Sequence, residues 1–233
     1  MPQNEKIEQL FDDIAPNYDR LNHIMSLGID RGWRRKAVKR IAELAPTRVL
    51  DLATGTGDFA VAIAKKLNDE ASVVGVDLSE NMLAVGRKKV AAAGLSQRVT
   101  LQSGNAEALS FPDESFDAVS VAFGVRNYEN LAVGLREGWR VLRPGGQMFI
   151  LELSSPDRQP WLGCYKLYSL KILPWIGGLI SGNRAAYQYL PESILRFPKP
   201  AQFLPMLQEA GFARCQVYNY TFGVCRIYVA EKF

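Results

Sequence analysis

Histidine and cysteine are scarce in this sequence of 233 residues. His23 is the only histidine, and the three cysteines are Cys164, Cys215 and Cys225. The cysteines lack C-x-x-C spacing, so no familiar zinc-ligand pattern can be assembled and no metal site is expected. Unpatterned cysteines in odd number are typical of reduced thiols, and we expect a cytoplasmic protein.

A basic leader and long apolar runs are also missing. The first stretch, MPQNEKIEQLFDDIAPNYD, holds acids where a signal peptide has a basic region followed by an apolar core, so secretion is not expected. The most apolar later stretch, ILPWIGGLISG, is interrupted by Pro174 and three glycines. It is shorter than the roughly 20 residues that span a bilayer, so any membrane contact should be peripheral.

Strong charge of one sign is lacking too, because the net charge is only +4. This excess is too small to predict a nucleic-acid partner, and much of it lies in DRGWRRKAVKR at 30–40. In and after this run, apolar residues recur at helical spacing: Trp33, Ala37, Val38, Ile41 and Leu44. Two interpretations stay open: a helix with a solvated basic face, or a basic helix that lies on anionic lipid.

Short β-rich runs alternate with helical patterns between residues 46 and 155, which predicts a doubly wound α/β fold. Strands are expected at 48–54, 72–79, 99–106, 116–124 and 147–155, and helices at 58–68, 80–94 and 131–146. Pro144, Gly145 and Gly146 are expected to close the last of these helices, and Asp58 to cap the first.

The remaining segments predict the domain organisation. Residues 1–45 are expected to form an N-terminal helical cover over a domain at 46–233, with the aromatic-rich 156–200 as a substrate lid inserted in it. After a helix at 200–212, two strands at 213–222 and 224–233 should form a hairpin that turns at Gly223.

The stretch VLDLATGTGDFA at 49–60 matches the G-x-G-x-x-[GA] fingerprint of nucleotide sites with Gly55, Gly57 and Ala60. Two acids, Asp51 and Asp58, flank these glycines. NAD presents a pyrophosphate to such a loop, and a carboxylate about 5 Å from a phosphate charge costs on the order of 3 kcal/mol at an effective dielectric constant near 20. S-adenosylmethionine carries an ammonium and a sulfonium group instead, so the acids favour this methyl donor over NAD.

Other interpretations of the two acids remain. Asp58 can serve only as a helix cap, and Asp51 can be a buried acid paired with a cation such as Arg48. Asp77 ends the second expected strand, where a carboxylate accepts the ribose hydroxyls of either cofactor. After the third strand, Asn105 can read the adenine edge beside the small Ala106, although a plain turn also explains that asparagine.

Four stretches together resemble the successive motifs of class I S-adenosylmethionine-dependent methyltransferases: VLDLATGTGD, VGVDLSENML, GNAEALSFPDESFDAVSVAFGVRN and WRVLRPGGQMFILELS. The resemblance narrows to the menaquinone and ubiquinone biosynthesis C-methyltransferases on YDRLNHIMSLGIDRGWR, FGVRN, RVLRPGGQMFILELS and YLPESILRFP. It implies a Rossmann-like, mostly parallel seven-stranded sheet with a C-terminal antiparallel hairpin. It also implies Thr56, Asp77, Asn105 and Ala106 as donor-binding positions, while Gly55 and Gly57 follow from the turn. Asp30 departs from the family pattern, in which His or Gln is frequent.

The implied reaction transfers a methyl group from S-adenosylmethionine to a ring carbon of a prenylated quinol, with demethylmenaquinol expected and a ubiquinone-pathway benzoquinol as the alternative. Arg126 is expected to stabilise the developing oxyanion and Asn127 to orient the same hydroxyl, although a salt bridge also explains the arginine. His23 is the candidate base, with Tyr18 and Asp19 as alternatives.

Further residues are expected to touch the lipid substrate. Tyr18, Asn22 and Trp33 of the first signature stretch are the candidate substrate-binding residues. An apolar groove for the prenyl tail, or a helical satellite core, is expected from Trp161, Tyr165, Tyr168, Leu170, Trp175 and Ile176.

Other functions and an assembly remain open at this point. A methyltransferase that acts on RNA or a small amine and a non-catalytic membrane-surface module are the competing functions, and an NAD dehydrogenase is remote. A homodimer and a location at the inner face of the cell membrane are further expectations.

Overall fold

The computed structural model describes residues 12, 23, 26, 28–167 and 184–233. The expectations for Tyr18, Asp19 and Asn22 therefore lie outside the described residues. The apolar run at 172–182 also lies outside them, as do four of the expected groove residues, Tyr168, Leu170, Trp175 and Ile176.

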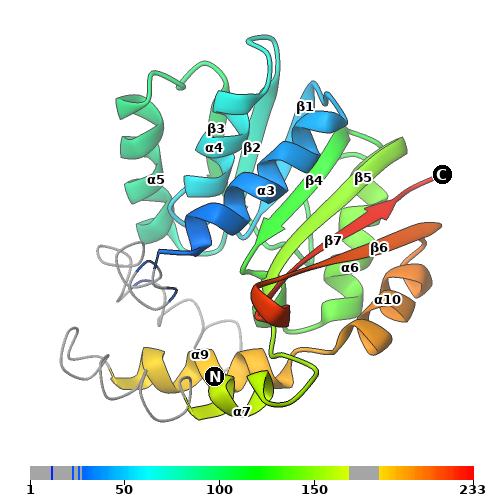
Figure 1. The fold of residues 1–233 in the computed structure, drawn as a ribbon. Helices are drawn as coiled ribbons and strands as arrows, with labels where there is room; N and C mark the ends of the chain where they lie inside the picture. Colours follow the sequence, from blue (N-terminus) through cyan, green and yellow to red (C-terminus); the bar gives the residue numbers. More distant parts are fainter. Residues whose placement is uncertain (1–11, 13–22, 24–25, 27, 168–183) are drawn as a thin grey trace.

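Seven strands form one sheet (Figure 1). They are β1 (Arg48–Leu52), β2 (Ser72–Asp77), β3 (Val99–Ser103), β4 (Phe116–Ala122), β5 (Leu142–Leu153), β6 (Arg214–Tyr220) and β7 (Cys225–Glu231). Their order is β3-β2-β1-β4-β5-β7-β6, and β7 runs antiparallel to both of its neighbours. This confirms the predicted doubly wound, mostly parallel sheet with a C-terminal hairpin.

The central strands are apolar on both faces because helices cover both sides of a parallel sheet. In β1, Val49, Leu50 and Leu52 are fully buried. The exception is the buried Asp51, which lies opposite Ser120 of β4 in the strand register. A charged residue at the centre of such a sheet needs a partner or a function.

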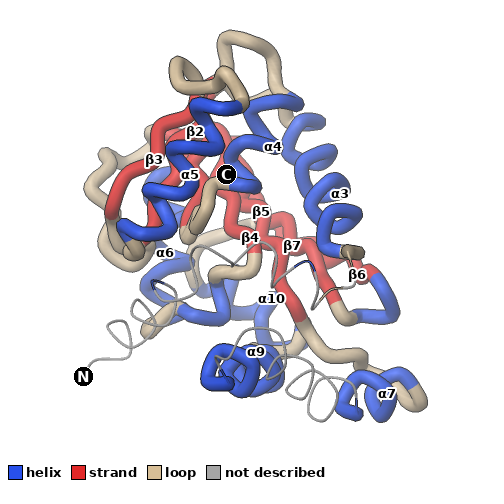
Figure 2. The backbone as a smooth tube through the Cα atoms, turned by 90° about the vertical axis from the view of Figure 1, so that its left-hand side faces the viewer, coloured by secondary structure: helices blue, strands red, loops and turns tan. Residues whose placement is uncertain are grey.

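Helices pack against both faces of the sheet (Figure 2). On one face, α3 (Asp30–Glu43), α4 (Asp58–Lys66) and α5 (Glu80–Ala92) bury a core around Ile41, Phe59 and Leu83. On the other face, α6 (Leu131–Val141) and α10 (Pro200–Glu209) bury a second core around Leu135 and Phe203.

The expectation that Pro144, Gly145 and Gly146 end a helix is wrong. Helix α6 ends at Val141, and β5 begins at Leu142, so these residues lie inside the strand. Leu142 already pairs with Phe116 of β4, and the register shifts between that pair and the next one. Pro144, Gly145 and Gly146 lie in this irregularity without a partner in β4, and backbone hydrogen bonds of Gly145 and Gly146 with Lys232 hold them in the sheet.

The expected helix cap at Asp58 is also wrong. Gly57 is the N-cap residue of α4, with a left-handed φ of 73°, and Asp58 is the first helical residue. A left-handed cap suits glycine because it has no Cβ. Asp58 therefore does not cap the helix. As the first helical residue, it places a negative charge at the positive end of the helix dipole, which stabilises the helix.

Helix α3 cannot present its apolar stripe to lipid. Trp33, Ala37, Val38 and Ile41 are buried in the core, which excludes the lipid-facing interpretation of this stripe. Two of its basic side chains lie over rings of β6: Lys36 Nζ is 4.4 Å from the ring centroid of Tyr220, and the Arg40 guanidinium is 3.3 Å from that of Tyr218.

Two further helices, α7 (Trp161–Leu167) and α9 (Arg184–Arg196), lie beyond the carboxyl edge of the parallel strands (Figures 1 and 2). They belong to the segment 156–200 that we expected to be a lid, and the division into cover, domain and lid stays a prediction. Within the described residues, no helix has both the length and the apolar character needed to cross a bilayer.

Candidate active site

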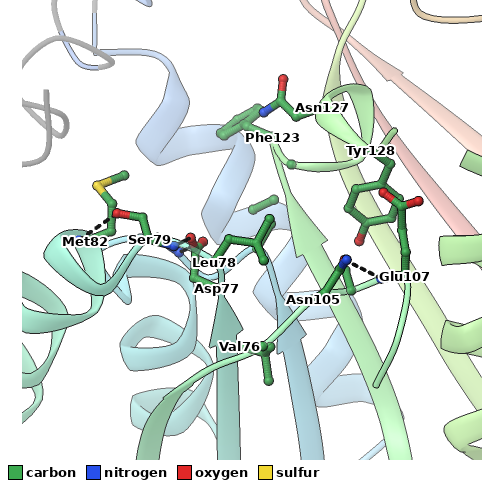
Figure 3. Close-up of a pocket in the computed structure, with 16 residues that line it drawn as sticks. Val76, Asp77, Leu78, Ser79, Met82, Asn105, Glu107, Phe123, Asn127 and Tyr128 are labelled. Atoms are coloured by element: carbon green, nitrogen blue, oxygen red, sulfur yellow. Dashed lines mark hydrogen bonds between the residues drawn. The ribbon is translucent and has the colours of Figure 1, made fainter. Parts of the chain in front are cut away.

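A cavity with an empty volume of about 710 Å³, part of it open to solvent, lies at the carboxyl ends of β1, β2 and β4 (Figure 3). We call it the main cavity. Doubly wound folds bind ligands at this edge, where the strand order reverses. Its wall includes Gly55, Asp77, Asn105, Phe123, Asn127 and Tyr128.

The glycine turn holds Asp77 in place. Gly55 and Gly57 both have positive φ angles, 56° and 73°, as the turn predicted. The backbone N–H of Gly55 donates to Oδ2 of Asp77 over 2.8 Å, and the N–H of Ser79 donates to Oδ1 over 3.0 Å. Burial raises the pKa of Asp77. A carboxylate has about four acceptor positions, so Asp77 can still accept the two hydroxyls of a ribose.

Asp51 is bound by hydroxyl groups and not by Arg48, whose guanidinium lies over Phe116. Thr54 Oγ1 donates to one Asp51 oxygen over 2.7 Å, and Ser120 Oγ donates to the other over 2.6 Å. Burial raises the pKa of Asp51 to about 6, and these two hydrogen bonds lower it only in part. A buried carboxylate of this kind favours a nearby cation.

A second, smaller cavity adjoins the same turn, with an empty volume of about 300 Å³, part of it open to solvent. We call it the side cavity; Asp51, Thr56, Asp58 and Arg34 all contribute to its wall. Lys89 donates to Asp58 Oδ1 over 2.6 Å and to Thr56 Oγ1 over 3.0 Å. Thr56 and Asp58 therefore lie beside the glycine turn but do not line the main cavity.

Asn105 and Ala106 both line the main cavity, as expected. The side-chain oxygen of Asn105 accepts a hydrogen bond from the backbone N–H of Glu107 over 2.8 Å, so the turn interpretation of this residue is also satisfied. Its NH₂ group is then the part of the amide that can donate to an adenine nitrogen.

Arg126 and Asn127 take different positions in the short helix η2 (Val125–Asn127). Arg126 forms a buried ion pair with Glu152 of β5, with 2.6 Å between Nη1 and Oε1. Its backbone N–H also donates to the same carboxylate over 3.2 Å. Asn127 lines the main cavity (Figure 3) and accepts a hydrogen bond from the Tyr189 hydroxyl of α9 over 2.9 Å. The structure thus brings Asn127, but not Arg126, to the cavity wall.

His23 and Trp33 lie outside the main cavity. Nδ1 of His23 is 3.0 Å from Oδ1 of Asp30; because a carboxylate only accepts, that nitrogen carries the proton. Trp33 is buried behind Phe123, with ring centroids 6.5 Å apart, and its Nε1–H donates to Thr221 Oγ1 over 2.9 Å. Trp33 therefore supports a wall residue and does not itself line the cavity.

Comparison with known proteins identifies the family of this chain. The model of the ubiE/COQ5 methyltransferase family matches residues 1–232. This chain belongs to that family.

Two curated relatives are similar over nearly the whole chain. A Bacteroides fragilis protein named demethylmenaquinone methyltransferase is 45% identical over 230 residues, which cover 99% of this chain and 94% of the relative. A Geobacter sulfurreducens protein named ubiquinone/menaquinone biosynthesis C-methyltransferase is 46% identical, with 99% and 90% covered. Among solved structures, a Thermotoga maritima S-adenosylmethionine-dependent methyltransferase has a TM-score of 0.67 at 21% identity, with 97% of this chain and 99% of that chain covered. The last match concerns the fold alone and confirms the class I arrangement.

The cofactor of this methyltransferase is S-adenosylmethionine, and the residues present fit it. Asp77 suits the ribose, and Asn105 with Ala106 suits the adenine. The hydroxyl of Tyr128 is buried and has no hydrogen-bond partner among the described residues, although its ring is part of the main cavity wall (Figure 3). An unsatisfied buried hydroxyl is costly, so a polar ligand in this cavity is physically favoured.

Several wall residues were not expected from the sequence. Phe123 begins the FGVRN stretch and Tyr128 follows it, while Ser79 caps α5 and Met82 lies in its first turn. Their position directly after a parallel strand was the available signal, because all such positions meet at one edge of the sheet. Arg34 gave no local signal, since it lies in a basic run more than twenty residues before the glycine turn.

Proposed function

We propose that this protein methylates a ring carbon of a prenylated quinol, converting demethylmenaquinol to menaquinol in menaquinone biosynthesis. The observation that carries the proposal is the full-length similarity to proteins named demethylmenaquinone methyltransferase, combined with a donor-type cavity at the edge of the sheet. A benzoquinol of the ubiquinone pathway is the alternative substrate, because one relative is named for both pathways.

The residues of the main cavity suit the positioning that this reaction needs. When bound, S-adenosylmethionine supplies an electrophilic methyl group and leaves as S-adenosylhomocysteine. A ring carbon attacks well only when its neighbouring hydroxyl has lost a proton, so the enzyme has to orient the ring and stabilise a phenolate away from water. The Tyr189 hydroxyl occupies the side-chain oxygen of Asn127, which leaves the NH₂ group of Asn127 as its donor toward that phenolate.

Arg126 and His23 keep their expected roles only as predictions. The charge of Arg126 is already balanced by Glu152, so a second role as oxyanion stabiliser competes with this ion pair. His23 has Nδ1 on Asp30, which leaves Nε2 as the atom that can accept a proton. Its side chain is 38% exposed, so bulk solvent can carry that proton away.

The proposal includes contact with the membrane surface, where a prenylated quinol resides. Trp161 of α7 stacks on Phe222 with ring centroids 4.0 Å apart, and these side chains are 45% and 66% exposed. Exposed aromatic pairs are typical of interfacial contacts. A Trp161→Ala/Phe222→Ala variant should lose cosedimentation with anionic vesicles. Phe233→Ala should retain it, because Phe233 is as exposed as Phe222 but lies after β7, away from this pair. The homodimer remains a prediction, which light scattering of the purified protein can test.

The direct test is anaerobic incubation of the protein with S-adenosylmethionine and chemically reduced demethylmenaquinone, followed by mass spectrometry of the lipid. We expect the mass of one added methylene unit, and no product from the oxidised quinone, which lacks an electron-rich ring carbon. Parallel reactions with a demethylated benzoquinol, RNA and a small amine distinguish the other substrates. No methylation of either quinol overturns the proposal.

A further inference from the structure

The side cavity contains a charged side chain that none of the roles above uses. Arg34 of α3 lines this cavity together with Asp51 and the glycine turn, and its side chain is only 15% exposed. Its Nε is buried and has no hydrogen-bond partner among the residues that the structure describes. An arginine held this way retains hydrogen-bonding capacity for an anion.

Neighbouring residues fix the direction of this arginine. Asp30 lies one helical turn earlier, with Oδ2 3.8 Å from Nε of Arg34, while Ser26 and His23 bind the other oxygen of Asp30. The Arg34 guanidinium also lies over the ring of Phe123, 5.3 Å from its centroid. Phe123 lines the main cavity, so Arg34 lines the side cavity and also contacts a wall residue of the main cavity.

The two cavities adjoin along the glycine turn. Ala53, Gly55 and Ala122 belong to the walls of both. A ligand whose nucleoside occupies the main cavity at Asp77 can therefore extend past Gly55 into the side cavity. The side cavity has less than half the empty volume of the main cavity, about 300 Å³ against about 710 Å³, which suits the shorter amino-acid end of such a ligand.

The charges in the side cavity are complementary to a zwitterion. Arg34 presents a positive group and Asp51 a negative one within the same small wall. The positive charge of Arg34 favours the ionised form of Asp51, although burial opposes it. An ammonium group beside Asp51 would form an ion pair with its carboxylate, and a carboxylate beside Arg34 would form one with its guanidinium.

We propose that Arg34 binds the carboxylate of the amino-acid end of S-adenosylmethionine, with Asp51 receiving the ammonium group, and that Asp30 holds Arg34 in position for this contact. The inference rests on the donor-binding function of the main cavity, and it is independent of which quinol is methylated. It makes the N-terminal helix α3 part of the donor site.

Calorimetric titration tests this proposal with three ligands: S-adenosylhomocysteine, its decarboxylated analogue, which keeps the ammonium group, and methylthioadenosine, which lacks the amino-acid end. The wild-type protein should prefer S-adenosylhomocysteine to the decarboxylated analogue by about 10- to 100-fold, the usual effect of a charged hydrogen bond. In Arg34→Met, affinity for S-adenosylhomocysteine should fall by about that factor, while the affinities for the other two ligands change by less than about threefold. Arg34→Lys should lie between, because it keeps the charge but not the planar fork.

The matched control is Arg35→Met, which removes the neighbouring exposed arginine and should bind all three ligands like the wild type. An equal loss for all three ligands in Arg34→Met overturns the proposal in favour of a structural role, and unchanged affinities overturn it outright. Failure of the wild-type protein to bind S-adenosylhomocysteine contradicts the donor-binding function itself, so the two failures are distinguishable.

Discussion

Breaking the buried ion pair between Arg126 and Glu152 should destabilise the fold strongly. The two side chains are 5% and 1% exposed, and their charged atoms lie 2.6 Å apart. Removing one partner leaves the other charge buried without compensation, which costs about 3–5 kcal/mol. In a chain of this length, that loss lowers the melting temperature by roughly 6–20 °C. We therefore expect this loss for Arg126→Met.

The double variant Arg126→Met/Glu152→Gln should recover most of this stability. It removes both charges, and glutamine keeps an oxygen that can accept from the backbone N–H of Arg126, which donates to Glu152 over 3.2 Å. We expect the double variant to lose no more than about 2 kcal/mol, because a buried pair replaced as a unit costs far less than a broken one.

Urea unfolding with linear extrapolation measures both effects. Arg196→Met is the matched control, because Arg196 pairs with Glu192 at the surface, with side chains 66% and 67% exposed, and should change the free energy of unfolding by less than about 1 kcal/mol. A loss below about 1 kcal/mol in Arg126→Met, or a double variant no more stable than the single one, would refute the reasoning. Turnover of the stable double variant then separates the roles: restored methylation indicates a structural arginine, and absent methylation supports the oxyanion role.

The remaining predictions concern the two cavities. Asp51 has a folded-state pKa raised by burial from 3.8 to about 6, so its contribution to stability is fully present below about pH 4 and is lost as the pH rises through 6; this amounts to about 3 kcal/mol. Asp51→Asn should remove this part of the pH dependence, which urea unfolding at pH 4, 5 and 7 detects as a change in the wild-type minus variant difference, and an unchanged difference contradicts the assignment. Asp77→Asn should weaken S-adenosylhomocysteine binding by about 10- to 100-fold, because a charged acceptor for the ribose is lost, and calorimetry showing wild-type affinity would exclude that role. Tyr189→Phe should lower kcat for the quinol while leaving the KM for S-adenosylmethionine nearly constant, because the hydroxyl orients Asn127; a change confined to the donor KM would argue against it.

Local patterns in the sequence were sufficient for the fold class and for part of the site. The parallel strands are continuous apolar runs separated by helical patterns, and both properties follow from residues close together in the chain. The same is true of the glycine turn and of Asp77, because a tight turn after one strand and an acid at the end of the next are local features. The positions of Asn105 and Ala106 in the cavity wall were also predictable locally, because both residues directly follow a parallel strand.

The tertiary structure decided what these side chains contact. Arg126 pairs with Glu152, 26 residues later, and Lys89 of another helix takes up the charge of Asp58. No periodicity encodes such pairs, because they depend on which elements become neighbours. Strand pairing also placed Pro144 inside β5, where its local signal predicted a helix end.

The sequence by itself determined the sheet, the glycine turn and the position of Asp77 at the end of β2, since each depends on short-range geometry. Only the packing of α3 against α4 and β5 brought Arg34 to the glycine turn and turned its neighbour Trp33 into the core. In the sequence these two residues belong to one basic amphipathic run whose partner is undefined. Burying the apolar stripe defined that partner, and it placed Arg34 at the wall of the side cavity.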